Sequence, residues 1–378
     1  MNDSDKDVIQ KPGTEEPEGL DSSETSGWGD EYPLDSIFVR REQRTVSEVV
    51  KRIKANRYIL NPEFQRSFVW SIKKQSRLIE SCLMRIPLPV FYVAEAKDGR
   101  IIVVDGLQRL TTFIRYLDGE FALSKLGEGR EDAPQENPLL GRRFSDLALN
   151  LQERLLDTQL ILYILDAKAP DRAKLDIFER VNSGEPLARQ QMRNCLFSGR
   201  ATKWLKDMAE NPPFLIATGE SLDKKSMRDR EAINRFCAFR LLGVEQYRGD
   251  MDDFLARVLE KMNTLSKQEM EDLALVFERS MWANFQFFGR HAFRKSLAMN
   301  NQHASRTVLN IALFDTCSVL FADLGENVIK EREEPLKNAI TNLLGNEDFI
   351  QAITYATNAR RQVKIRFEMM AKAIAEAI

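Results

Sequence analysis

The sequence predicts a mixed α/β (α+β) domain followed by an all-α domain. Short apolar runs typical of strands occur only before about residue 200, and helical periods dominate from residue 201 onward. Residues 1–31 stand apart, since they hold ten acids and two bases and show no apolar periodicity. We expect them to form a disordered acidic tail. The predicted domains are then residues 32–200 and residues 201–378.

The near-neutral total charge hides an uneven distribution. The chain has 55 Lys and Arg against 57 Asp and Glu, a net charge of −2. Without the tail, 53 bases and 47 acids remain, which leaves residues 32–378 with a net charge of +6. A basic body can accept an anionic ligand, and the tail is expected to mask that basic surface until a partner displaces it.

Helix signals in the first domain are local. Thr45 and Glu48 form a capping box ahead of apolar residues at helical spacing, and Ser71 can cap a helix that ends near residue 85, before Pro87 and Pro89. Further helices are expected over residues 110–117, 170–181 and 187–197, and in the second domain over residues 233–242, 254–262, 308–320 and 363–378.

Strand signals are limited to the first domain. Residues 90–94 and 101–104 flank an Asp98-Gly99 dipeptide that favours a tight hairpin, and residues 159–165 form another apolar run. We expect an extended segment over residues 58–70 and a long loop over residues 124–143.

Several classes of protein are excluded by composition. The four cysteines lie at least 42 residues apart and form no CxxC pair, so we expect reduced core thiols. The two histidines cannot build a multi-histidine metal site, and neither GxxxxGK[ST] nor a complete GxGxxG is present. No uncharged apolar run approaches the ~18 residues of a membrane span, so a cytoplasmic location without membrane contact is expected.

The most informative segment is residues 101–112, where an apolar strand runs through a polar turn into a helix. Such a turn presents backbone N–H groups and the positive end of a helix dipole, which suit a phosphate. Gly106 permits close approach of a ligand, Arg109 can clamp phosphate oxygens, and Thr111 or Thr112 can donate a hydroxyl group.

Two further side chains of this segment suit hydrolysis. Asp105 can hold Mg²⁺, and Gln108 can orient an attacking water. The alternative is that Asp105 and Gly106 form a plain turn and Arg109 a structural ion pair. The residue types alone leave both interpretations open.

Two other segments carry candidate residues. Residues 61–70 place Gln65 and Arg66 among aromatic side chains, an arrangement that can stack a base and clamp a phosphate. Their alternative is an aromatic core beside a surface arginine. Asn182 precedes Ser-Gly at a helix end and is either a cap or a ligand contact.

Four separated motifs occur in a recognisable order and spacing. They are Phe64-Gln65-Arg66…Trp70, Leu78-Ile79-Glu80-Ser81…Ile86-Pro87-Leu88-Pro89, Val104-Asp105-Gly106-Leu107-Gln108-Arg109-Leu110-Thr111-Thr112 and Phe178…Asn182-Ser183-Gly184…Leu187. Over residues 36–200 the chain resembles the N-terminal domain family of GmrSD-type restriction endonucleases, within the ParB/sulfiredoxin-like superfamily. The family commonly has Gln where this chain has Leu107, while the Asp, Gly, second Gln and Arg are in place.

The resemblance implies a ParB/sulfiredoxin-like fold and binding and hydrolysis of a nucleoside triphosphate at the Asp-Gly-x-Gln-Arg motif, in prokaryotic defence against phage or foreign, often modified DNA. The leading hypothesis, which combines this resemblance with the chemistry of the residues, makes Asp105, Gln108 and Arg109 catalytic and Asp105 the ligand of a Mg²⁺ ion that accompanies the nucleotide. It makes Gln65, Arg66, Gly106, Thr111, Thr112 and Asn182 nucleotide-binding.

An HNH-type nuclease domain follows in the commonest arrangement of that family. Its site needs a histidine base and further metal ligands. Neither His291 nor His303 has an E-H-x-x-P-like context, and we expect a helix-face residue and a loop residue respectively. The chain is therefore expected to lack the nuclease half and to act with a separate nuclease subunit.

A basic and aromatic patch at residues 282–295 is the candidate nucleic-acid surface. Arg290, Arg294 and Lys295 can pair with DNA phosphates beside stacking aromatic rings. The alternative is a core helix with a solvated basic edge.

Three functions follow from these features. The leading hypothesis is a nucleotide-hydrolysing protein of a restriction or anti-phage system. The alternative from another class is a non-catalytic nucleotide- or DNA-binding adaptor that regulates a separate nuclease. A weaker third is direct DNA nicking by the N-terminal domain.

Overall fold

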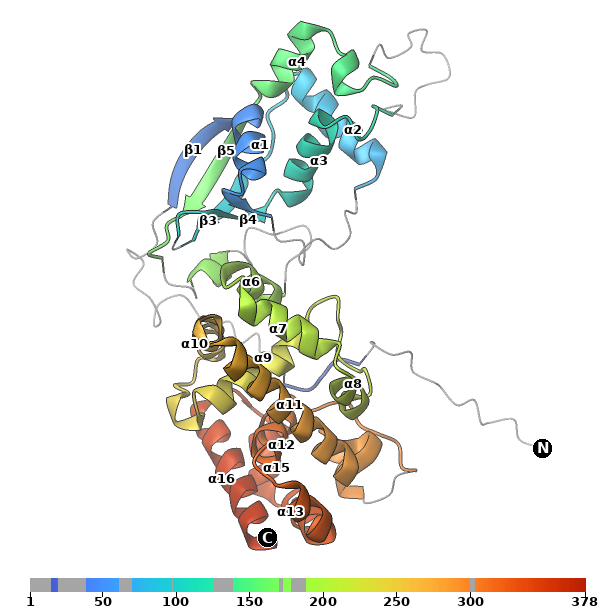
Figure 1. Ribbon diagram of the computed structural model, residues 1–378, viewed down its shortest axis with the longest axis vertical. Helices are drawn as coiled ribbons and strands as arrows, with labels where there is room; N and C mark the ends of the chain where they lie inside the picture. Colours follow the sequence, from blue (N-terminus) through green and yellow to red (C-terminus); the bar gives the residue numbers. More distant parts are fainter. Residues whose placement is uncertain are drawn as a thin grey trace, which may run out of the picture. The chain divides into compact units, whose positions relative to one another are not determined.

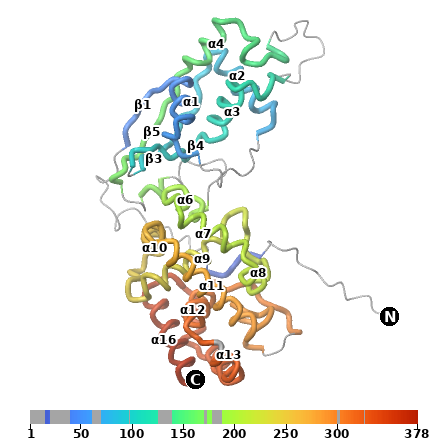
Figure 2. The backbone as a smooth tube through the Cα atoms, viewed as in Figure 1, coloured from blue at the N-terminus to red at the C-terminus, as the bar shows by residue number. Residues whose placement is uncertain are grey.

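The computed structural model describes residues 15–19, 39–60, 70–96, 98–124, 139–169, 173–177, 188–299 and 303–378. The chain divides into two compact units (Figures 1 and 2). The α/β unit comprises Gly27–Leu196, and the helical unit combines Met1–Ser26 with Phe197–Ile378. The predicted order of a mixed α/β part followed by an all-α part is confirmed.

The α/β unit is built on a five-stranded mixed sheet of order β1-β5-β3-β4-β2. The outer pair β1·β5 and the central pair β3·β4 are antiparallel, whereas β3·β5 and β2·β4 are parallel. The strands are β1 (Val39–Thr45), β2 (Tyr58–Ile59), β3 (Phe91–Glu95), β4 (Ile101–Asp105) and β5 (Gln159–Leu165). The predicted hairpin and the predicted strand over residues 159–165 are both present.

Helices α1 to α4 lie together beside the sheet (Figure 1). They are α1 (Val46–Lys54), α2 (Ile72–Leu83), α3 (Leu107–Leu117) and α4 (Leu149–Leu156); α6 (Arg189–Leu196) comes later in this unit. Thr45 and Ser71 cap their helices as predicted, since they accept from the N–H groups of Glu48 and Lys74. The Glu48 carboxylate, however, pairs with Arg52 at 2.8 Å and does not complete the predicted capping box. Alternate residues of the strands, such as Val93 and Val103, are buried in one apolar cluster with these helices.

The helical unit contains the four helices whose periods the sequence shows. These are α9 (Arg228–Leu241), α10 (Met251–Thr264), α12 (Ile311–Phe321) and α16 (Arg360–Ala377). The other described helices are α7 (Arg200–Ala209), α8 (Pro212–Thr218), α11 (Lys267–Phe288), α13 (Glu326–Glu331), α14 (Glu333–Leu343) and α15 (Glu347–Thr354). No described helix of the chain is both long and apolar enough to cross a bilayer.

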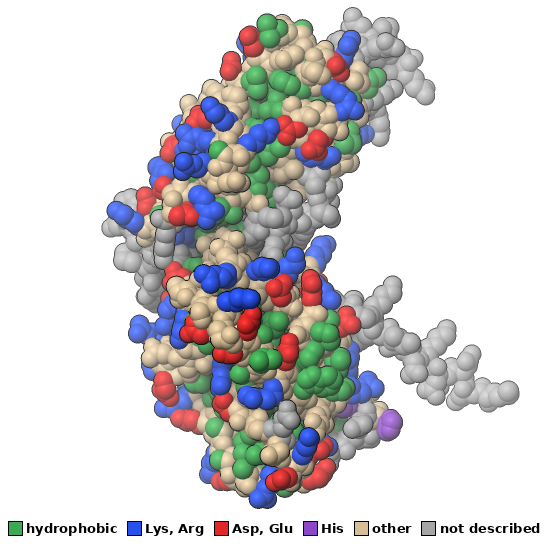
Figure 3. Space-filling model, in the orientation of Figure 1, with side chains coloured by type: hydrophobic (Ala, Val, Ile, Leu, Met, Phe, Trp, Pro, Cys, Tyr) green, Lys and Arg blue, Asp and Glu red, His purple; other side chains and the backbone are tan. Residues whose placement is uncertain are grey.

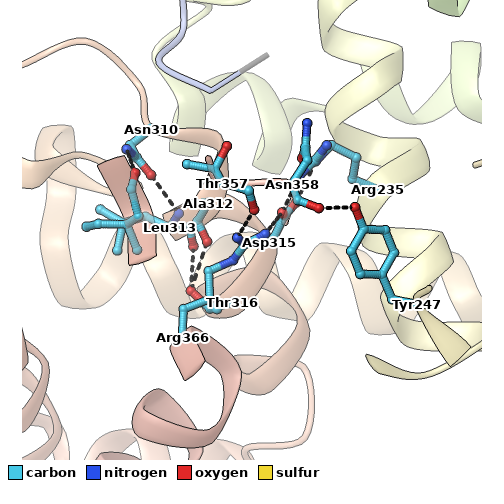
Figure 4. A network of polar contacts seen from close by, with 11 residues as sticks. Arg235, Tyr247, Asn310, Ala312, Leu313, Asp315, Thr316, Thr357, Asn358 and Arg366 are labelled. Atoms are coloured by element: carbon cyan, nitrogen blue, oxygen red, sulfur yellow. Dashed lines mark hydrogen bonds and ion pairs between the residues drawn. The ribbon is translucent and has the colours of Figure 1, made fainter. Parts of the chain in front are cut away.

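A buried ionic network joins three helices of this unit (Figure 4). Asp315 on α12 accepts from Arg235 on α9, at 2.9 and 2.6 Å, and from Arg366 on α16, at 2.7 Å. All three side chains are at most 1% exposed. Two cations therefore share one anion in the interior, which makes the carboxylate indispensable to both.

The four cysteines are free and buried, as the sequence predicts. Burial raises the pKa of every one of these thiols, to about 12 for Cys82 and Cys317. They are inert as nucleophiles in the folded chain at neutral pH.

The expected disordered tail is ordered over part of its length. Glu15–Gly19 belongs to the helical unit, and Glu18 forms a parallel β-bridge with Asn310. Composition suggests disorder because these residues have no apolar periodicity, but their carboxylates and backbone find partners on the helical unit. The other residues of the tail lie outside the described part of the chain.

Candidate functional site

The β4–α3 turn brings the central candidate residues together. Strand β4 ends at Asp105, Gly106 follows with a left-handed φ of 101°, and α3 begins at Leu107. A Cβ atom on Gly106 would lie 2.2 Å from Cδ1 of Phe91, whose ring is buried. Both the backbone angle and the close approach of this ring therefore require glycine here.

Arg109 is a buried bracing residue of the turn. Its guanidinium donates to the carbonyl oxygens of Pro89 and Val90, the latter at 3.0 Å, and to Asp105 Oδ2 at 2.9 Å. It also lies over the Phe91 ring, 4.1 Å from the centroid. Burial lowers the pKa of Arg109, and the Asp105 carboxylate opposes that shift. This arginine holds the loop before β3 against the end of β4.

The Asp105 carboxylate remains accessible beside its ion pair. The side chain is 34% exposed, and its ion pair with Arg109 is made through Oδ2, one of its two oxygens. The start of α3 lies directly after it, and this first turn holds no acidic residue and no side-chain cap. The first N–H groups of a helix have no intrahelical partner. A carboxylate therefore stands next to a cluster of backbone donors.

Gln108 and the two threonines occupy different environments. The Oε1 atom of Gln108 is buried and has no hydrogen-bond partner among the described residues. Thr112 is fully buried and donates to the Gln108 carbonyl at 2.8 Å, which commits its hydroxyl to the helix. Thr111 is half-buried. Of these three side chains, Gln108 is the one with a buried oxygen that has no hydrogen-bond partner among the described residues.

Three nucleotide-binding candidates, Gln65, Arg66 and Asn182, lie outside the described residues. Within the described ranges, no group of three or more His, Cys, Asp or Glu side chains could hold a metal ion. A divalent ion at Asp105 could take phosphate oxygens of a bound nucleotide among its other ligands, as Mg²⁺ ordinarily does.

In the patch expected to bind nucleic acid, two of the three basic residues pair with acidic residues of the N-terminal segment. Arg294 is fully buried and pairs with Glu15 at 2.6 Å, and Lys295 pairs with Glu18 at 2.6 Å. Arg290 is exposed on a short 3₁₀ turn that follows α11. The expected basic surface is thus largely neutralised by the tail. Basic and acidic side chains are also interspersed over this unit on the face that Figure 3 shows.

The two histidines are not equivalent. His291, expected on a helix face, is buried in the same 3₁₀ turn with Nδ1 2.9 Å from the Ser296 hydroxyl. His303 is exposed in a turn, as expected.

The α/β unit has a cleft that was not predicted from the sequence. It has a volume of about 620 Å³ and lies between the end of α2, α4 and the edges of β1 and β5. Its polar lining consists of Gln43, Arg85, Asn150, Glu153, Arg154, Asp157, Thr158 and Gln159. These polar residues come from separate segments and form no motif of their own, although Ile86, Pro87 and Leu88 of the second quoted motif also line the cleft. Asp105, Gln108 and Arg109 are not among its lining residues.

The fold and the turn define a class of protein: an α/β domain whose strand-to-helix turn joins a carboxylate, a left-handed glycine and a helix N-terminus. Residues 46–198 match the family described as GmrSD restriction endonuclease, N-terminal domain. The match indicates a component of a restriction or anti-phage system. No curated protein and no solved structure matches the chain.

Proposed function

We propose that the α/β unit binds a nucleoside triphosphate with Mg²⁺ at the β4–α3 turn and hydrolyses it, and that this activity serves a restriction or anti-phage system acting on foreign or modified DNA. The observation that carries the proposal is the placement of an accessible carboxylate, Asp105, directly beside the uncapped N-terminus of α3. Backbone donors at such a terminus bind phosphate, and a carboxylate beside them can complete the shell of a phosphate-bound Mg²⁺.

Each residue of the turn has a role in the proposal. Gly106 lets the backbone make the left-handed turn into α3 against the Phe91 ring, where a Cβ atom would lie 2.2 Å from Cδ1 of that ring. Asp105 holds the Mg²⁺ ion that the nucleotide brings. Gln108 uses its Oε1 atom, which has no hydrogen-bond partner among the described residues, to orient the attacking water. Arg109 positions Asp105 and the loop before β3, and reaches a phosphate only if its contacts there rearrange.

The remaining candidates complete the pocket. Gln65, Arg66 and Asn182 are proposed to contact the nucleotide, together with the Thr111 hydroxyl. Thr112 has a structural role instead, because its hydroxyl is already bonded within α3.

The second candidate function is a nucleotide- or DNA-binding adaptor that regulates a separate nuclease without turnover. The engagement of Arg109 favours it, because a guanidinium held by Pro89, Val90 and Asp105 is less free to neutralise charge that develops in a transition state. In both functions a partner subunit cuts the DNA.

A phosphate-release assay on the full chain with ATP, GTP, CTP and UTP tests hydrolysis, and nucleotide binding is measured alongside. Asp105→Ala should abolish release. Asp98→Ala is the matched control, since Asp98 also pairs with an arginine, at 2.7 Å, but lies in the exposed β3–β4 hairpin. Binding without release would favour the adaptor. Release that survives Asp105→Ala would refute the site.

A further inference from the structure

The segment Glu15–Gly19 is bound to the helical unit by ion pairs at its first residue. The Glu15 carboxylate accepts from Arg294 at 2.6 Å and from Arg306 at 2.8 Å. Its side chain is only 7% exposed, and that of Arg294 is 1% exposed. A buried cation without a counter-ion is strongly destabilising. The helical unit is therefore electrostatically complete only with a carboxylate in this position.

Glu18 adds both charge and backbone contacts. Its carboxylate accepts from Lys295 Nζ at 2.6 Å and from Asn310 Nδ2 at 3.1 Å. Its N–H donates to the Leu309 carbonyl at 2.8 Å, and its carbonyl accepts from the N–H of Ile311 at 2.9 Å. This pairing is a short β-augmentation, in which an extended peptide adds to an exposed stretch of backbone.

The surroundings of the remaining positions restrict which residues can occupy them. Gly19 has a φ of 91°, and a Cβ there would lie 2.9 Å from Cγ2 of Ile311. Pro17 is buried, whereas Glu16 is exposed. Positions 15, 17, 18 and 19 thus have individual requirements, and position 16 accepts any residue that leaves the backbone extended.

These contacts are specific to a peptide. A phosphate or a nucleic-acid backbone can satisfy the cationic side chains, but it offers neither the N–H and carbonyl pair that bonds Leu309 and Ile311 nor a left-handed glycine that fits against Ile311. The charge pattern of the segment also matches its receptor residue by residue, with Glu15 opposite two arginines and Glu18 opposite a lysine.

We propose that the helical unit carries an acceptor groove, formed by Arg294, Lys295, Arg306 and the backbone of residues 309–311, for an extended acidic peptide of the pattern Glu-x-Pro-Glu-Gly. The resident ligand of the acceptor groove is this chain's own segment Glu15–Gly19. A peptide of the same pattern binds in trans when the resident segment is disabled.

The experiment uses the full chain carrying Glu15→Ala and Glu18→Ala, and a fluorescent peptide of residues 12–22 as the probe. The variant should bind the peptide saturably, and its Tm should rise as peptide is added. The wild-type chain should bind at least ten-fold more weakly, because its acceptor groove is filled. Peptides with Glu15→Ala or Gly19→Ala should lose at least ten-fold in affinity, and the matched Glu16→Ala peptide should bind as the parent does.

Equal binding by wild type and variant would overturn the proposal, as would no binding by a folded variant or equal losses for the Glu15→Ala and Glu16→Ala peptides. If the double variant does not fold, the single variant Gly19→Ala keeps every charge and supplies the test. It should accelerate hydrogen exchange at the Ile311 amide, which donates to Glu18. Exchange at the wild-type rate would refute the groove.

Discussion

Replacing Asp315 with asparagine removes the carboxylate that two buried arginines share. The side chain accepts three hydrogen bonds, from Arg235 at 2.9 and 2.6 Å and from Arg366 at 2.7 Å, and it is fully buried. Asparagine has nearly the same shape, so the change leaves packing in place and tests the charge. The amide leaves two guanidinium ions in the interior with no anion between them.

The expected cost follows from that burial. Breaking one buried ion pair by removing a partner costs roughly 3–5 kcal/mol. Because two pairs are broken here, Asp315→Asn should lower the free energy of unfolding by at least about 4 kcal/mol. A domain is stable by only about 5–15 kcal/mol, so the loss should be easy to measure.

Urea unfolding followed by far-ultraviolet circular dichroism measures this loss as a shift of the midpoint. The control is Asp323→Asn: Asp323 pairs with Arg240 at 2.7 Å, but its side chain is 60% exposed, so about 0–1 kcal/mol is expected. A loss for Asp315→Asn no larger than that of the control would refute the reasoning. The triple variant Arg235→Met, Asp315→Leu, Arg366→Met replaces the whole network with apolar side chains and should restore most of the stability.

The other predictions concern the turn and a buried acid. Gly106→Ala should lower the free energy of unfolding by about 2 kcal/mol more than Gly99→Ala, because both have positive φ but only Gly106 meets a ring; equal losses would contradict the close approach. Burial raises the pKa of Asp229 to about 6. A raised acid pKa stabilises the fold below about pH 4, and this contribution is lost as pH rises through 6. At pH 8 the free energy of unfolding of Asp229→Asn should therefore be higher than that of wild type by up to about 3 kcal/mol, and at pH 4 the two should not differ in this way. Urea unfolding at both pH values measures this, and a difference in midpoint that does not depend on pH would disprove the raised pKa of Asp229.

Most of the fold follows from local signals in the sequence. The caps at Thr45 and Ser71 and the hairpin at Asp98-Gly99 rest on contacts within a few residues, so the chain itself displays them. Strand β1 was not predicted because it is an edge strand in which Arg40, Arg41, Glu42 and Arg44 are charged, so it lacks the apolar run of β4 or β5.

The roles of the site residues depend on contacts that the sequence does not show. The adjacency of Asp105, Gly106 and Gln108 is visible in the chain, and so is their placement at a strand-to-helix turn. The contacts of Arg109 with Pro89 and Val90 are not, because they join segments 19 and 20 residues apart. Nor does composition reveal that Glu15 pairs with an arginine 279 residues away.

A crystal structure of the full chain with Mg²⁺ and a non-hydrolysable nucleoside triphosphate analogue tests the central claim most directly. The account predicts phosphate oxygens within hydrogen-bonding distance of the N–H groups at the start of α3, with Mg²⁺ between them and Asp105. Nucleotide bound elsewhere, for example in the cleft between α2 and α4, would contradict it.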